Sequence, residues 1–175
     1  MAGLDQVRAL SHPTRLRLLE LFAEKPRTTK QAAEVLGEAP TRLYHHVAAL
    51  ERAGLIRLRE TRPVRGAVEK YFEATAKRYV ADEDSLRDPA HKRDLAAMGL
   101  VVFDQARNEL VQALTKEEPP EDLVAVRGVF RLSQSAARQL RRDLTRLLKD
   151  LHVTARGGRN RKRYSVTIAL VRTED

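Results

Sequence analysis

Residues 40–53 form the segment of this sequence that most restricts its fold. Their apolar side chains Leu43, Val47 and Leu50 recur at the spacing of one helix face, and Gly54 follows as a helix terminator. Such a pattern predicts an amphipathic helix whose apolar side is buried. The opposite side of that helix is then left exposed to solvent.

Two further helical patterns precede this segment. Pro13 suits the first turn of an amphipathic helix that ends near Pro26. Thr28 or Thr29 can cap a short second helix, and Gly37 is suited to a left-handed stop after it. A tight turn then leads into residues 40–53.

Two strand-like runs follow, over residues 55–61 and 68–74. Pro63 and Gly66 lie between them and mark the turn of a β-hairpin. The order of helix, helix, turn, helix and hairpin predicts a winged helix-turn-helix over about the first 75 residues.

The pattern of the remaining residues predicts a linker, a long helix and a smaller unit. An acidic stretch over 81–89 precedes a helix over 90–116, and residues 123–132 alternate as a strand. A helix capped by Ser133 or Ser135 and a last strand from Tyr164 complete the pattern. The apolar positions of the long helix are Leu95, Met98, Val102, Ala106, Leu110 and Leu114, and those of the strands are Val124, Val126, Phe130, Leu132, Tyr164, Val166, Ile168 and Leu170.

The expected fold is therefore mainly α with small β, in three parts. These are a winged helix-turn-helix over 1–80, an acidic linker with a long dimerisation helix over 81–122, and a basic strand-helix-strand unit over 123–175. Counting Lys and Arg against Asp and Glu gives them net charges of +6, −6 and +9. Two basic regions flank an acidic middle, which favours a polyanion such as nucleic acid as their partner.

The exposed side of the helix over 40–53 carries side chains that suit DNA. Thr41, His45 and Arg52 lie opposite the apolar side, and Arg42 and Tyr44 flank them. Guanidinium, hydroxyl and imidazole groups bind base edges in the major groove and phosphates of the DNA backbone. The hairpin adds candidate phosphate contacts at Arg57, Arg59, Arg62, Arg65 and Lys70. The alternative reading of these hairpin cations is a solvated strand edge.

Two runs, SHPTRLRLLELF (11–22) and TRLYHHVAALERAGLI (41–56), together with the hairpin, resemble the ArsR-type family of bacterial winged-helix regulators. The resemblance covers about 75 residues and implies a homodimeric operator binder. Tyr44 stands where many members carry a DNA-contacting Ser. The cysteine-bearing motif of the metal-sensing members is absent, so metal sensing is not carried over.

The sequence offers little for catalysis, metals or membranes. It holds no cysteine, no paired nucleophile and base, and no phosphate-cradling glycine loop, so we expect no enzyme activity and no cofactor. The histidines favour structural, DNA-contacting or surface roles over a metal site, with His46 on the buried side and His12 as a helix cap. No run of about 20 apolar residues is present, so we expect a cytoplasmic protein without a membrane partner.

Two features leave alternatives open. The helix over 90–116 fits a dimer interface or an ordinary core helix. The last helix places arginines opposite its leucines, which fits a solvated face, an additional phosphate surface or a site for an acidic partner.

The function expected is a sequence-specific transcription regulator, a homodimeric repressor that binds an inverted repeat in double-stranded DNA and responds to an unidentified small-molecule effector. The alternatives are a winged-helix protein-interaction module and a nucleoid-type DNA binder without sequence preference.

Overall fold

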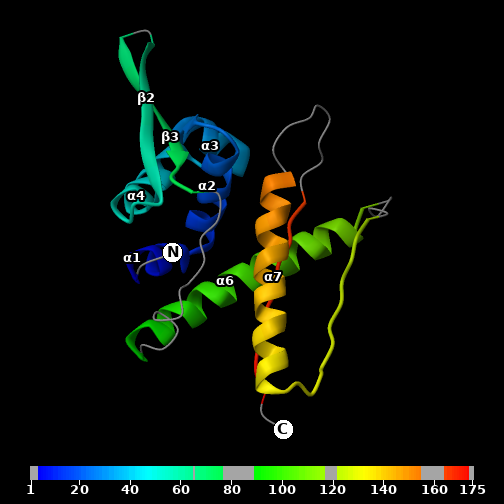
Figure 1. Cartoon of the computed structure of the whole chain (residues 1–175). Coiled ribbons are helices and arrows are strands. Elements are labelled where there is room, and N and C mark those ends of the chain that lie inside the picture. The colour runs from blue at the N-terminus through cyan, green and yellow to red at the C-terminus, as the bar shows by residue number, and fades with distance from the viewer. Residues whose placement is uncertain (1–3, 65, 77–88, 117–121, 155–163, 174–175) are drawn as a thin grey trace. The chain divides into compact units, whose positions relative to one another are not determined.

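The computed structural model describes residues 4–64, 66–76, 89–116, 122–154 and 164–173. The chain divides into two compact units, residues 1–109 and 110–175. The expected domain boundary at residue 80 lies outside the described residues, and the one at residue 122 stays a prediction. Four helices begin the N-terminal unit: α1 (Leu4–Leu10), α2 (Pro13–Glu24), α3 (Thr29–Leu36) and α4 (Pro40–Arg52) (Figure 1).

The starts and stops of these helices follow the local sequence. The Nδ1 atom of His12 accepts a hydrogen bond of 3.2 Å from the backbone N–H of Thr14 and caps α2. Thr28 and Gln31 form a reciprocal capping box at α3, each bond 3.1 Å long. Gly37 ends α3 at φ 68°, the left-handed conformation that glycine adopts without strain. The expected caps and the expected stop are confirmed.

A three-stranded antiparallel sheet completes the winged helix. Its strands are β1 (Arg27–Thr28), β2 (Ile56–Val64) and β3 (Ala67–Ala74), in the order β1-β3-β2. The β2–β3 hairpin projects beyond the helices, as Figure 1 shows. The hairpin predicted from the sequence is thus present with longer strands, whereas α1 and the two-residue β1 were not predicted.

The core lies between the helices and the base of the hairpin. Its central residues are Leu18 and Phe22 of α2, Ala32 and Ala33 of α3, Leu43, Val47 and Leu50 of α4, Leu55, Ile56, and Phe72 of β3. The rings of Phe22 and Phe72 meet edge to face at 6.2 Å, a favoured aromatic geometry. The apolar side predicted for residues 40–53 is the buried side, so α4 is fixed in rotation.

Helix α6 (Pro89–Leu114) agrees with the predicted long helix. Its residues 89–109 belong to the N-terminal unit, where the Arg8 guanidinium lies 2.9 Å from the Asp94 carboxylate. The Ser11 hydroxyl donates to the Asp94 carbonyl at 3.2 Å, and Met98 packs against the core. These contacts attach α6 to α1 and to the start of α2.

The C-terminal unit contains helix α7 (Gln134–Thr154). Ser133 caps it by accepting from the backbone N–H of Ala136 at 3.2 Å, as predicted. The two strands expected on either side are not confirmed: residues 122–133 and 164–173 contain no strand in the described chain. A strand requires a hydrogen-bonded neighbour, and the described residues of these two segments are assigned to none of the three strands of the sheet.

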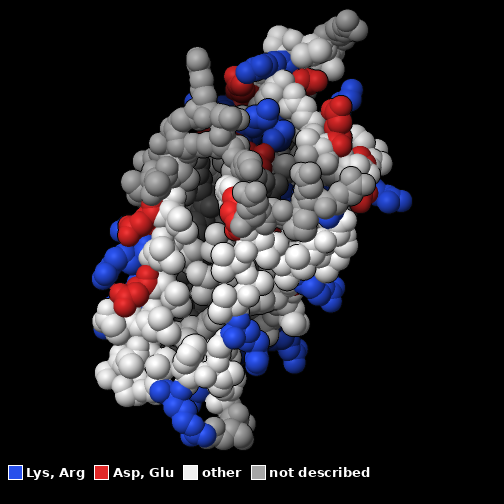
Figure 2. All heavy atoms as spheres, turned by 90° about the vertical axis from the view of Figure 1, so that its right-hand side faces the viewer, with Lys and Arg blue, Asp and Glu red and all other residues white. Residues whose placement is uncertain are grey.

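Charged side chains are unevenly paired on the surface. In the face drawn in Figure 2, some Lys and Arg side chains lie beside Asp or Glu, and others have no acidic side chain next to them. The affinity of the chain for a polyanion therefore depends on which cationic side chains have a carboxylate neighbour.

Candidate nucleic-acid interface

Helix α4 has one buried side and one exposed side. The buried residues are Leu43, His46, Val47 and Leu50. The five residues predicted to read DNA, Thr41, Arg42, Tyr44, His45 and Arg52, are all exposed. Because successive residues turn by about 100°, Ala48 lies between His45 and Arg52 on that side, and its small side chain leaves room for close approach. The exposed side of α4 is therefore a surface that can enter a groove.

The N-terminus of α4 is open to an anion. Ala39 precedes the helix without a side-chain hydrogen bond to it, and Pro40 is its first residue. The first N–H groups of a helix lack partners within it and carry a partial positive charge. Arg42 lies in the same turn, 78% exposed, with its guanidinium 3.7 Å from the Glu38 carboxylate.

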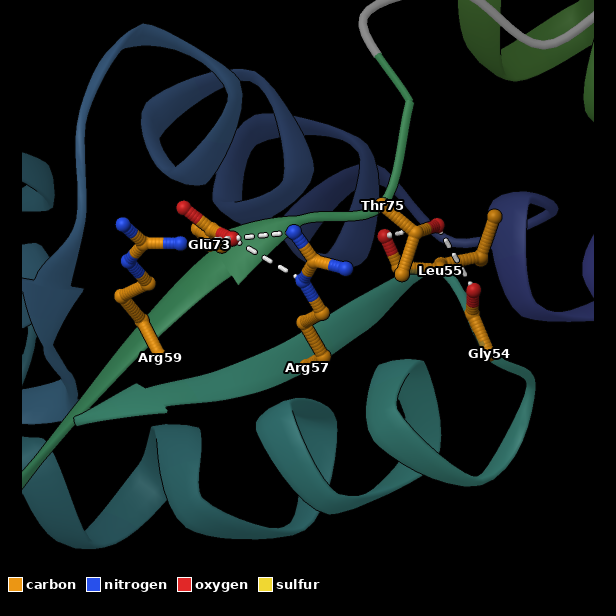
Figure 3. A network of polar contacts seen from close by, with 6 residues as sticks. All are labelled: Gly54, Leu55, Arg57, Arg59, Glu73 and Thr75. Atoms are coloured by element: carbon orange, nitrogen blue, oxygen red, sulfur yellow. Dashed lines mark hydrogen bonds and ion pairs between the residues drawn. The ribbon is translucent and has the colours of Figure 1, made fainter.

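The C-terminus of α4 fixes the hairpin. Gly54 follows the helix at φ 66°, and the Thr75 hydroxyl at the end of β3 donates to the Gly54 carbonyl at 2.8 Å and the Leu55 carbonyl at 3.1 Å (Figure 3). The backbone N–H of Thr75 also donates to the Leu55 carbonyl at 2.9 Å. These bonds tie the end of β3 to Gly54 and Leu55, the residues that lie between α4 and β2.

Three histidines meet where α2 begins beside α4. The His46 ring lies 4.5 Å from that of His12 and 3.8 Å from that of His45, centroid to centroid. Burial, and after it the neighbouring groups His45, His12 and Arg15, together lower the pKa of His46 to about 4. Burial lowers the pKa of His12 as well. His46 is thus a neutral core residue, as expected, and the Nδ1 atom of its ring has no hydrogen-bond partner among the described residues.

A groove of about 380 Å³ separates α4 from the hairpin. Its lining residues are Thr28, Thr29, Lys30, Tyr44, Val47, Ala48, Glu51, Val68, Glu69, Lys70 and Phe72. The groove brings the predicted residues Tyr44 and Lys70 together and adds Lys30 from the first turn of α3. Two ammonium groups near the exposed side of α4 can hold phosphates, while Glu51 and Glu69 limit where an anion can lie.

The arginines of β2 lie beside a carboxylate of β3. The Arg57 guanidinium contacts Glu73 through two hydrogen bonds of 2.7 and 2.9 Å, and a nitrogen of Arg59 lies 3.6 Å from the same carboxylate oxygen (Figure 3). Both arginines remain more than half exposed. Glu73 therefore offsets part of the positive charge predicted at the base of the hairpin.

Arg62 lies on the other side of the hairpin from Lys70. Cross-strand neighbours share a face, and Arg62 pairs with Glu69 in the register, whereas Lys70 pairs with Thr61. Arg62 lies 4.6 Å from the centre of the Tyr71 ring. A hydrogen bond to Glu60 raises the pKa of its guanidinium above the ordinary value.

The predicted residues thus form separate groups rather than one patch. Tyr44 and Lys70 line the groove, Arg57 and Arg59 meet at Glu73, and Arg57 and Arg62 lie on the face of the hairpin opposite Lys70. Arg65 lies outside the described residues. Sequence reasoning missed Lys30 and Glu73, because no local pattern shows which distant element each one faces; the only local signal is that Lys30 follows the Thr28 cap by two positions.

The described residues form no evident metal-binding site. No group of three or more His, Asp or Glu side chains in the described ranges is arranged to hold an ion. His91 and Asp94 lie three residues apart on α6, a spacing that can suit a metal, but Asp94 accepts a hydrogen bond of 2.9 Å from Arg8.

Comparison with known proteins identifies the N-terminal part. Residues 10–59 match the model of a helix-turn-helix domain family. This range runs from the end of α1 through α4 into β2, so the element that the family model describes is the one built around the exposed side of α4. None of the curated proteins matches the chain. A helix-turn-helix domain indicates a DNA-binding regulator. Among the described helices, none is both long and apolar enough to cross a bilayer.

Proposed function

We propose that this chain is a sequence-specific transcription regulator that inserts α4 into the major groove of double-stranded DNA. The observation that carries the proposal is the exposed side of α4 within a helix-turn-helix domain. Side chains of α4 that differ in hydrogen-bonding capacity, Thr41, Arg42 and His45, read base edges there. Tyr44, in place of the serine of many ArsR-type members, contacts DNA from the groove side.

The groove and the hairpin supply the sequence-independent part of this binding. Lys30 and Lys70 hold phosphates from the groove beside α4, and Arg52 reaches the backbone from the last turn of the helix. Arg57 and Arg59 also contribute to phosphate binding, but Glu73 reduces their contribution because its carboxylate offsets part of their positive charge. Arg62 and Arg65 serve the outer part of the hairpin.

The proposal includes a homodimeric repressor of the ArsR type that binds an inverted repeat. Two copies with two-fold symmetry read half-sites about 34 Å apart. Helix α6 is the candidate interface, because Leu100 is 73% exposed and Phe103, Val111 and Leu114 are also exposed on it. An unidentified small-molecule effector regulates the binding. The protein acts in the cytoplasm, without catalysis and without a cofactor.

The experiment begins by selecting binding sites for the full chain from fragmented genomic DNA. Affinity for the selected duplex is then compared with affinity for a scrambled duplex. Arg42→Ala is expected to cost about 1–3 kcal/mol on the selected duplex, and less on the scrambled one, because a base contact carries the discrimination. Arg17→Ala removes the same charge from an exposed position of α2 and serves as the matched control.

Each outcome of this experiment supports one of three functional hypotheses. Loss of discrimination in Arg42→Ala but not in Arg17→Ala supports sequence-specific regulation. Equal affinity of the wild type for every duplex contradicts it and indicates a nucleoid-type binder. Failure to bind any duplex leaves the protein-interaction module as the better explanation.

A further inference from the structure

Helix α7 carries a dense row of cations on one side. We call Arg138, Arg141, Arg142, Arg146 and Lys149 the arginine face. All five side chains are exposed. At about 100° per residue they occupy one side of the helix, and Leu140, Leu144 and Leu151 lie on the opposite side. The helix therefore separates its charge from its apolar residues along about three turns.

Few carboxylates offset this charge. Within the described residues, Arg146 lies 3.6 Å from Asp143, and Arg138 and Lys149 take part in no ion pair. The hairpin differs, since Arg57 and Arg59 share Glu73 and Arg62 contacts Glu60 at 2.6 Å. A polyanion that approaches the chain thus finds more unpaired charge on α7 than on β2.

The spacing of the arginine face suits a nucleic-acid backbone. Arg138, Arg142 and Lys149 fall four and seven residues apart on nearly the same line, so they span about 16 Å at 1.5 Å per residue. One strand of duplex DNA carries a phosphate about every 3.4 Å of axis, which gives about five phosphates over that length. Guanidinium groups also bind phosphate oxygens in pairs.

We propose that the arginine face of α7 binds the phosphate backbone of DNA. It adds a sequence-independent and salt-dependent part to the affinity, apart from the base contacts of α4. This inference rests on the proposed function, which makes duplex DNA the polyanion that the chain meets.

The test uses the full chain with Arg138→Gln, Arg142→Gln and Lys149→Gln combined. Glutamine retains the helix propensity of the residues it replaces, and circular dichroism checks that α7 is intact. Affinity for the selected duplex and for a scrambled duplex is measured from 50 to 400 mM salt. Three lost phosphate contacts reduce the slope of log affinity against log salt by about 2–3. Both duplexes are expected to lose affinity by the same factor, about tenfold or more at the lowest salt, so the specificity ratio stays constant.

A matched variant distinguishes contact from general attraction. Arg127→Gln, Arg131→Gln and Arg172→Gln remove the same total charge from exposed positions of the same unit outside α7. An equal loss in both triple variants, or an unchanged slope in the α7 variant, overturns the proposal.

Two more results separate this inference from the function it rests on. If the wild type binds all duplexes equally, sequence-specific regulation is contradicted. If, in addition, only the α7 variant shows a reduced slope of log affinity against log salt, the arginine face is still supported. A wild type that binds no duplex overturns both. If the α7 variant instead loses binding to vesicles with 30% anionic lipid while its DNA slope is unchanged, the face binds lipid headgroups and the proposal is wrong.

Discussion

The imidazole rings of His12 and His46 lie 4.5 Å apart where the start of α2 meets α4. His12 uses its Nδ1 atom to cap α2, and His46 is buried with a pKa lowered to about 4. Both roles require the neutral imidazole, because a protonated Nδ1 cannot accept a hydrogen bond and a buried cation lacks hydration. The junction between α2 and α4 therefore depends on pH.

Stability is expected to fall as the pH is lowered from about 6.5 to about 4. The unfolded chain binds a proton at His46 near its ordinary pKa of 6.5, whereas the folded chain binds it only near 4. The contribution of neutral His46 is thus complete above pH 6.5 and disappears as the pH approaches 4. Its size is about 3 kcal/mol, from 1.36 kcal/mol per pKa unit. Urea unfolding between pH 7.5 and 4 measures it.

His46→Gln is the control for this pH dependence. Glutamine removes the titrating group and keeps a polar side chain of similar length. The variant is less stable at pH 7, but its stability should change less between pH 6.5 and 4 than that of the wild type. Parallel curves for the two proteins would show that His46 does not carry the effect.

The cap at His12 can be tested by its acceptor atom. His12→Ala removes the acceptor for the Thr14 N–H and should cost about 1 kcal/mol of unfolding free energy at pH 7. His12→Asn supplies a side-chain oxygen at the same position and should retain most of that stability. If both variants lose the same amount, the packing of the His12 ring against His46, rather than the cap, stabilises the junction.

Local patterns predicted the winged helix because each signal acts over a few residues. The capping residue Thr28, the left-handed Gly37 and the apolar spacing of Leu43, Val47 and Leu50 all specify α3 and α4 without reference to distant parts of the chain. The exposed side of α4 followed from its buried side by geometry alone. That is why all five predicted residues of α4 are found exposed.

Partnerships between distant residues could not be read in the same way. The alternation around Arg57 predicted a strand, but not that Glu73, sixteen residues later, would lie 2.7 Å from it. In the C-terminal unit the alternation over 164–170 is equally regular, yet the described chain provides no strand beside it. Periodicity reports which side of a segment is apolar, and a sheet needs a neighbouring strand as well.

Thr75 should affect both stability and DNA binding. Thr75→Val keeps the shape of the side chain and removes the hydroxyl that donates to the Gly54 and Leu55 carbonyls. The expected loss is about 1 kcal/mol of unfolding free energy, with weaker binding to selected and scrambled duplexes because the hairpin base is less fixed. Thr75→Ser keeps the hydroxyl and should bind as the wild type does. A Thr75→Val protein with unchanged affinity would show that the hairpin does not need this anchor.

Glu73→Gln should strengthen binding to any duplex. The substitution removes the carboxylate that contacts Arg57 and Arg59 and leaves both guanidinium groups available to phosphates. Affinity for selected and scrambled duplexes is expected to rise several-fold at low salt, and the salt slope to steepen by about 1–2.

Glu24→Gln makes the same charge change in a different ion pair. Its partner Arg27 has a side chain that is only 14% exposed, so releasing it offers little to DNA. An equal increase in both variants would trace the effect to net charge, since long-range attraction does not depend on which carboxylate is removed. If Glu73→Gln leaves affinity and slope unchanged, Arg57 and Arg59 do not contact the backbone, and the base of the hairpin is a solvated edge.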